Sequence, residues 1–232
     1  MSDAVQVLSA GAPQTGVAGC IAAFAAARDV GIDARFATAP TIRGVMEGDA
    51  ARHPDLVIVP VALMRALVAG GRAHADSVVR VGDVKAGVVV RRGAAHPDIS
   101  GEDALRQSIL DADRVIYNEA SSGAYIRTMV ETLGIADAVA AKTERLPSAG
   151  EVMKRLAAGE GAEIGFGQVP AIRRLAEAGV DLVGPLPGGL GHTTSYAAAL
   201  TVASRRAEAA RQFLDYLGTD AAREILSAGG VD

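Results

Sequence analysis

The chain has 232 residues, of which 50% are hydrophobic and 3% aromatic, with no Trp and a formal net charge of −4. This length and apolar content suffice for one large domain or two small lobes with a sizeable core. The scarcity of aromatic rings and the lack of a basic run argue against a nucleic-acid surface, which needs stacking faces or clustered positive charge.

The first part of the chain alternates short apolar runs with helical patterns. We expect strands at Val5–Leu8, Ala34–Ala37 and Asp55–Pro60, and helices at Pro13–Val30, Thr41–Glu47 and Ala62–Ala69. Such alternation is typical of an α/β fold with a largely parallel sheet.

The rhythm changes at Ser77–Arg91, where the β runs Ser77–Val81 and Ala86–Val90 follow each other without a helix between them. A second α/β set follows, with strands at Arg114–Tyr117, Ala162–Phe166 and Asp181–Pro185, and helices at Glu102–Asp111, Ser122–Leu133, Gly150–Ala158 and Pro170–Ala178. A β run at Thr194–Val202 and helices at Arg205–Leu217 and Ala221–Ala228 end the chain. This order predicts two lobes, residues 1–82 with 190–232 and residues 83–189, with a ligand crevice between them.

The stretch Tyr117–Tyr125 carries the strongest functional signal. It joins a buried strand to an amphipathic helix and places Ser121, Ser122 and Gly123 where that helix begins. The first turn of a helix offers unpaired N–H groups, and small residues let an anion approach them. The alternative is that one serine is only an N-cap.

Small polar residues also follow the other strands, as in Ser9-Ala-Gly-Ala, Thr38-Ala-Pro-Thr and Gly167-Gln-Val. Four motifs follow one another along the chain: Val7-Leu-Ser-Ala-Gly-Ala, Asp55-Leu-Val-Ile-Val-Pro, Ile116-Tyr-Asn-Glu-Ala-Ser-Ser-Gly-Ala-Tyr and Glu163-Ile-Gly-Phe-Gly-Gln. In this order the chain resembles the molybdate-type extracellular solute-binding proteins, and the resemblance covers nearly its whole length. The resemblance implies the type II periplasmic-binding-protein fold, in which two α/β lobes hold a ligand in the cleft between them.

Carried over position by position, the resemblance implies ligand donors at Ser9, Ala10, Thr38, Ala39, Ser121, Ser122, Val152 and Gln168. It implies a small anionic ligand, no metal or cofactor, and an ABC transporter permease as partner if the protein is exported. The family's molybdate binders usually have a serine in the second loop and commonly a tyrosine at the place of Gln168. These differences leave the identity of the ligand open.

The chain also resembles bacterial aconitate isomerases around Pro97-Asp-Ile-Ser, Ala120–Tyr125 and Gly165-Phe-Gly-Gln. An organic polycarboxylate would favour a nearby cation, which Arg43 or Arg127 could supply unless both are solvated helix residues. His192 is then the candidate catalytic residue, because an imidazole can move a proton near neutral pH. The alternative for His192 is a loop histidine at the surface.

The remaining signals concern location and structure. The lone cysteine, Cys20, lies in a small apolar helical stretch and is expected to be a buried structural thiol. No window is long and apolar enough for a membrane span, and no zinc-ligand spacing is present. We expect no signal peptide in the chain as it stands and therefore a cytoplasmic protein, or a periplasmic one if a leader has been removed.

Overall fold

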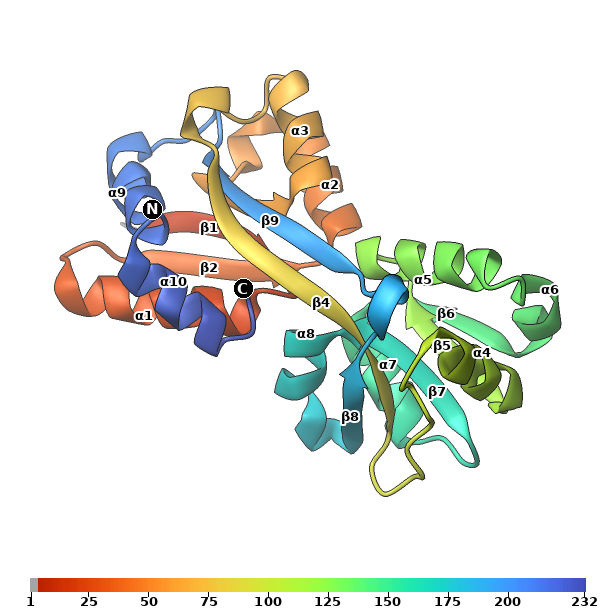
Figure 1. Cartoon of the computed structure of the whole chain (residues 1–232). Helices are drawn as coiled ribbons and strands as arrows, with labels where there is room; N and C mark the ends of the chain where they lie inside the picture. The colour runs from red at the N-terminus through yellow and green to blue at the C-terminus, as the bar shows by residue number, and fades with distance from the viewer. Residues whose placement is uncertain (1–3) are drawn as a thin grey trace. The chain divides into compact units, whose positions relative to one another are not determined.

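The computed structural model describes residues 4–232 and is drawn in Figure 1. The chain forms two compact units, which we call unit 1 (residues up to Val84 and Thr194–Asp232) and unit 2 (Lys85–Thr193). Strand β4 (Val79–Arg91) carries the chain from unit 1 into unit 2, and the chain returns at the start of β9 (Thr193–Leu200). The lobe bounds expected at 1–82 with 190–232 and at 83–189 stay a prediction.

The sheet of unit 1 has three parallel strands, β1 (Val5–Ala10), β2 (Ile32–Ala37) and β3 (Leu56–Pro60). Strand β1 lies between β2 and β3, and β9 pairs antiparallel with β3. All five residues of β3 are buried, which is the reason its sequence is a continuous apolar run. The parallel register brings the carboxyl ends of β1 and β2 together, with Ala10 opposite Ala37.

The helices of unit 1 are α1 (Gln14–Ala27), α2 (Ala39–Glu47), α3 (Val61–Ala69), α9 (Ala207–Leu217) and α10 (Asp220–Ala228), with short 3₁₀ turns at Ala50–Arg52 and Ala75–Ser77. Helices α1 and α10 approach closely, because Gly16 has no side chain to separate it from Leu226. One turn along, Cys20 is fully buried with its Sγ 3.6 Å from the carbonyl oxygen of Ala222. Cys20 is therefore the buried thiol that the sequence predicts, and its burial raises its pKa to about 11.

The sheet of unit 2 has three parallel strands, β5 (Arg114–Asn118), β6 (Thr143–Leu146) and β7 (Glu163–Gln168). Strand β4 pairs antiparallel with β7 and with β8 (Val180–Pro185). Helices of this unit are α4 (Glu102–Asp111), α5 (Ser121–Thr132), α6 (Ala136–Val139), α7 (Ala149–Ala157) and α8 (Val169–Arg174), with 3₁₀ turns at Ala140–Lys142, Ala176–Ala178 and Gly188–Leu190.

Successive residues of β5 contribute to different cores in unit 2. Val115 packs in a cluster that includes Leu105 of α4 and Ile126 of α5, whereas Ile116 packs in one that includes Val152 of α7. Side chains alternate between the faces of a strand, so the sheet is covered on both faces. This double coverage holds β5 between α4 and α5 on one face and α7 on the other.

An ion network ties α7 to the sheet of unit 2. The guanidinium of Arg155 makes two hydrogen bonds to the carboxylate of Glu163, at 2.9 and 3.2 Å, and a third to Glu144 at 3.1 Å. The hydrogen bonding of Arg155 to the Glu163 carboxylate is the largest cause that raises the pKa of Arg155. Glu163 is buried, and this bidentate partner satisfies a carboxylate that would otherwise be costly to bury.

Several details differ from the sequence-based expectation. The β runs expected at Ser77–Val81 and Ala86–Val90 are parts of one 13-residue strand, Val79–Arg91, in which Gly82 has a φ of 145°. Ser77 lies before this strand, in a 3₁₀ turn. Strand β6 and helix α6 were not predicted, since both are four residues long and β6 is only half-buried. The helix expected at Pro170–Ala178 ends at Arg174, and β7 extends to Gln168. No helix among residues 4–232 has the length and apolar content to cross a membrane.

Candidate functional site

The carboxyl edge of the unit 2 sheet gathers three helix starts. Strands β5, β6 and β7 are parallel and end at Asn118, Leu146 and Gln168, and α5, α7 and α8 begin within three residues of those ends. Helix N-termini therefore meet at one edge of this sheet, where parallel α/β folds bind their ligands. Among the described side chains, none caps the first turn of α5, whereas Ser148 caps α7 by accepting from Glu151 N–H at 3.2 Å.

Asn118 holds the loop that leads into α5. Its Oδ1 accepts a hydrogen bond from Ala120 N–H at 2.8 Å, and its Nδ2 donates to Ser122 Oγ at 3.3 Å. Both Asn118 and Ser122 are buried. The sequence analysis missed Asn118, although an Asn at the end of a strand that bonds the backbone two residues on is a common turn device. Asn118 therefore positions the donors that the sequence predicts at the start of α5. Ser121 is the first residue of that helix, and its side chain lies outside the described part of the structure.

Gly123 is required by close packing at the same place. A Cβ at this position would overlap the carbonyl oxygen of Asn118. The first turn of α5 thus lies directly against the end of β5, and only glycine permits that approach.

Gln168 and His192 lie on opposite sides of the same residue of β4. Gln168 is the last residue of β7, is buried, and is the register partner of Ala86. On the other side, the N–H of Ala86 donates to the carbonyl oxygen of His192 at 2.8 Å. The structure therefore brings Gln168 and His192 to the same edge of the unit 2 sheet.

His192 is half-buried and stacks on an aromatic ring of α5. The ring centroids of His192 and Tyr125 are 3.8 Å apart with an interplanar angle of 9°, and Tyr125 Oη donates to the carbonyl oxygen of Leu190 at 2.9 Å. Burial lowers the pKa of His192 from its ordinary value, which favours the neutral imidazole that can accept a proton. Tyr125 is the second residue at this edge that the sequence analysis did not single out.

The carboxyl edge of unit 1 holds the other expected donors, Ser9, Ala10, Thr38 and Ala39. Ser9 is fully buried and its Oγ donates to the carbonyl oxygen of Ala10 at 3.0 Å. Thr38 is half-buried and caps α2 by accepting from Thr41 N–H at 3.4 Å, so Ala39 is the first residue of that helix. The backbone of Gly11 donates to Ala37 O at 3.1 Å, which brings these four residues together.

Three further expected contributors are Val152, Arg43 and Arg127. Val152 has no exposed surface, packs in the core beside α7, and its N–H donates within the helix to Ser148 O at 3.1 Å, so the residue itself offers no free donor. The Arg43 side chain is 51% exposed and pairs with Glu47 on the next turn of α2 at 3.6 Å. Arg127 is exposed on α5. Both arginines therefore have the exposed positions on helices that the alternative interpretation expected.

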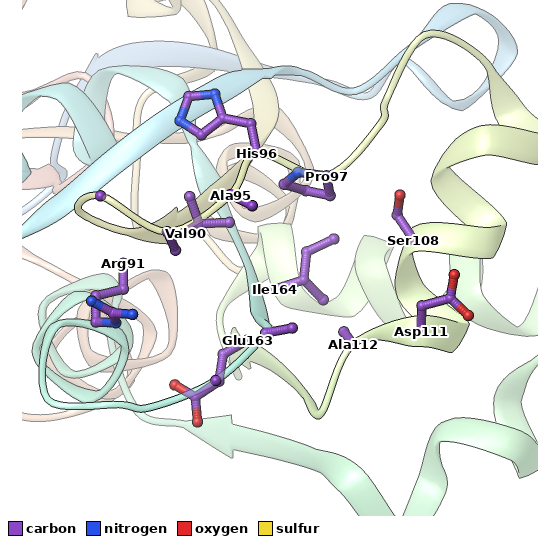
Figure 2. A pocket seen from close by; sticks show the side chains of 14 residues that line it. Val90, Arg91, Ala95, His96, Pro97, Ser108, Asp111, Ala112, Glu163 and Ile164 are labelled. Carbon is purple, nitrogen blue, oxygen red and sulfur yellow. The ribbon is translucent and has the colours of Figure 1, made fainter.

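A cavity of about 530 Å³ in unit 2 lies at the opposite, amino end of β5 and β7 (Figure 2). Figure 2 shows Arg91 and His96 on one side, Ser108 and Asp111 on the other, and Ile164 between them. Ser108 Oγ already donates to Asp98 O at 2.9 Å. The cavity contains none of the expected donors. Among residues 4–232, no group of three or more His, Cys, Asp or Glu side chains is arranged to hold a metal ion.

Comparison with known families identifies the class of protein. Residues 5–232 match the family described as bacterial extracellular solute-binding protein, and the chain belongs to that family. The α/β fold and the relationship to periplasmic binding proteins that the sequence indicated are thereby confirmed.

Individual relatives add detail. The chain is 35% identical over 179 residues to an aconitate isomerase from a Pseudomonas species, a match that covers 75% of this chain and 66% of that protein, just under two thirds of its length. A periplasmic molybdate-binding protein from Azotobacter vinelandii superposes with a TM-score of 0.74 at 15% identity, covering 98% of both chains. The sulfate-binding protein SubI from Mycobacterium tuberculosis superposes with a TM-score of 0.72 at 19% identity, covering 99% of this chain and 86% of its own. The two structural matches show the fold alone.

Proposed function

We propose that this chain binds a small oxyanion or organic carboxylate as its solute, with the carboxyl edge of the unit 2 sheet as the principal donor surface. The observation that carries the proposal is the start of α5, which no described side chain caps and which Asn118 and Gly123 hold against the end of β5. Backbone N–H groups at a helix start, together with the Ser122 hydroxyl and the Gln168 amide, are donors suited to an anion.

The donors of unit 1 form a second part of the proposal. Thr38, Ala39 and the backbone after Ser9 lie at the equivalent, carboxyl edge of their own sheet. Neutral donors can hold a desolvated anion because each hydrogen bond to a charged group contributes roughly 1.5–3 kcal/mol. The molybdate and sulfate named for two structural relatives are ligands of this kind, which supports testing oxyanions first. Delivery of the solute to an ABC transporter permease in the periplasm is part of the same proposal.

A second candidate function is isomerisation of an unsaturated polycarboxylate. The favouring observation is the half-buried His192 stacked on Tyr125 at the edge that contains Gln168, together with a lowered His192 pKa. A neutral imidazole could take a proton from one carbon of the substrate and return it to another. The 35% identity to an aconitate isomerase makes aconitate the substrate to test.

A thermal-shift panel separates the two functions. Molybdate, tungstate, sulfate, cis-aconitate and trans-aconitate would each be added to the wild-type chain, and a ligand at about 100 times its Kd should add roughly 2.7 kcal/mol of stability. Stabilisation by the oxyanions with none from the carboxylates would reject the isomerase. Conversion of trans-aconitate to cis-aconitate, followed by proton NMR and abolished in His192→Gln, would reject a purely passive binder.

Ser122→Ala tests the donor surface directly. We expect it to weaken binding of the stabilising anion by about 1–3 kcal/mol, because a hydrogen-bond partner of the ligand is lost. Ser227→Ala is the matched control, since its exposed side chain lies on α10, 3.4 Å from Asp232 Oδ1, and belongs to neither set of expected donors. An unchanged Kd in Ser122→Ala, measured by calorimetry, would remove the start of α5 from the site.

A further inference from the structure

Unit 1 has a cavity of about 660 Å³ at the amino end of its sheet, the end opposite Ser9 and Thr38. Its walls come from the amino-terminal parts of β1 and β2, the segment before β3, and the turn before α9. The three strand segments are neighbours, because Gln6 and Asp33 are register partners and Gln6 O accepts a hydrogen bond from Asp55 N–H at 2.8 Å. The volume is within the range of about 300–1,000 Å³ that is usual for small-molecule sites.

The charged lining of this cavity is predominantly positive although the chain carries a net charge of −4. The lining includes two acidic residues, Asp33 and Asp55, and four basic ones, Arg35, Arg52, Arg205 and Arg206. Positive charges that share a wall repel one another, so such a concentration favours an anion that neutralises it.

Asp55 does not supply that neutralisation, because its oxygens are already engaged with the protein. Its Oδ2 accepts from Gln6 N–H at 2.9 Å, and its Oδ1 accepts from Ser204 Oγ at 2.9 Å and from the backbone N–H groups of Arg205 and Arg206 at 2.9 and 3.1 Å. Desolvation opposes these bonds, yet together they hold the pKa of Asp55 below its ordinary value. The carboxylate thus fixes the turn on which two of the arginines stand.

Two arginines of the cluster have no carboxylate partner among residues 4–232. Neither Arg35 nor Arg52 forms an ion pair with a described side chain, and the Arg205 guanidinium donates to the carbonyl oxygen of Ala51 at 3.2 Å. Guanidinium groups recognise phosphate and carboxylate oxygens with paired donors, and several of them converging on one cavity match a multiply charged anion.

A separate observation points to the same cavity. His53 lines it, and its Nε2 is buried without a hydrogen-bond partner among the described residues. A buried polar nitrogen left unpaired costs free energy, whereas a bound anion would accept a hydrogen bond from it.

We propose that this cavity binds a phosphate-bearing small molecule, through Arg35, Arg52, Arg205 and His53. The site lies at the opposite end of the strands from the unit 1 donors of the proposed solute site, so its occupancy does not require that solute. The class of ligand follows from the cationic donors and the volume, and it includes free polyphosphates and phosphorylated metabolites.

Calorimetric titration of the full chain with sodium pyrophosphate at low ionic strength tests the proposal. We expect saturable binding with one site per chain and a Kd that rises about tenfold in Arg35→Gln and in Arg52→Gln, because each removes a charge-assisted contact. Arg211→Gln is the matched control, since it removes the same charge from an exposed position on α9 outside the cavity. Both cavity variants change exposed side chains and should keep the melting temperature of the wild type without ligand.

The alternatives give different results in the same experiment. An equal loss in Arg211→Gln would mean general charge attraction and would overturn the site, as would the absence of saturable binding. Binding to phosphatidylglycerol vesicles without binding to soluble pyrophosphate would replace the small-molecule site with a lipid-surface contact. Ser122→Ala should leave the pyrophosphate Kd unchanged, and this separates failure of the cavity from failure of the proposed solute site.

Discussion

The carboxyl edges of the two sheets present similar donors but hold them by different means. In unit 1 the edge is organised by backbone contacts, with Gly11 N–H donating to Ala37 O, and by the Thr38 cap of α2. In unit 2 a buried side chain, Asn118, organises the loop, and Gly123 allows α5 to lie against the end of β5.

This difference indicates where each edge tolerates change. Backbone pairing is insensitive to most side chains, so the unit 1 edge should accept alanine at Gly11 and at the fully buried Ser9 with only small losses of stability. The unit 2 edge depends on one amide side chain and on the absence of one Cβ, so single substitutions there should disturb the donors of the proposed site. The predictions below test this contrast in order of expected effect.

The largest effect should come from the two glycines that follow the strand ends. Gly123→Ala should destabilise the native state by about 3 kcal/mol or more, because its Cβ would overlap Asn118 O and force the backbone to move. Gly11→Ala should cost less than about 1 kcal/mol, since the nearest atom to its Cβ would be Ala37 O at 3.9 Å. Urea unfolding measures both, and equal losses would contradict the contrast.

A smaller effect is expected from the buried polar side chains. Asn118→Ala should cost about 2 kcal/mol, because the half-buried Ala120 N–H and the buried Ser122 Oγ each lose a partner. Ser9→Ala should cost about 1 kcal/mol, since its hydroxyl bonds only the neighbouring carbonyl among the interactions described. A Ser9→Ala loss larger than that of Asn118→Ala in denaturant titrations would reverse the assignment of the more dependent edge.

The helix caps should behave alike in the two units. Thr38→Ala removes the cap of α2 and Ser148→Ala that of α7, and each should cost about 1 kcal/mol. Thermal unfolding of the two variants checks this. If only one of the two variants lost stability, the helix caps would also differ between the two units, in addition to the Asn118 loop.

The smallest effect concerns pH. Burial holds the pKa of His192 below its ordinary value of 6.5, so the unfolded chain takes up this proton first as the solution is acidified. Stability should therefore fall as the pH drops from 6.5 toward the folded-state pKa, and His192→Gln should flatten the profile in that window. Identical profiles for the wild type and the variant would mean that His192 is not shielded from water.

Much of the fold could be predicted from sequence because long apolar runs and helical periodicity survive in the structure. Asp55–Pro60 was expected as a buried strand and is one from Leu56, and Glu102–Asp111 was expected as a helix and forms one with those bounds. Strand β6 escaped prediction because Thr143–Leu146 contains Glu144 and Arg145 and presents no apolar alternation. Its position depends on pairing with β5, a contact that local sequence does not encode.

The candidate site was predictable only in part, for a similar reason. Hydroxyls after strands can be found in a sequence, and Ser122 and Thr38 lie where strands end. The roles of Asn118 and Tyr125 depend on three-dimensional neighbours, a loop amide for one and His192 for the other. Val152 was placed by resemblance alone, and its full burial in the core is a feature that the resemblance did not predict.

Because Cys20 is fully buried, its reactivity can report on the separation of the helices that cover it. The sequence contains no Trp, so intrinsic fluorescence offers little contrast, but a single thiol between α1 and α10 is chemically silent until those helices separate. The rate at which a thiol reagent labels it would therefore time the opening of unit 1 without any engineered label.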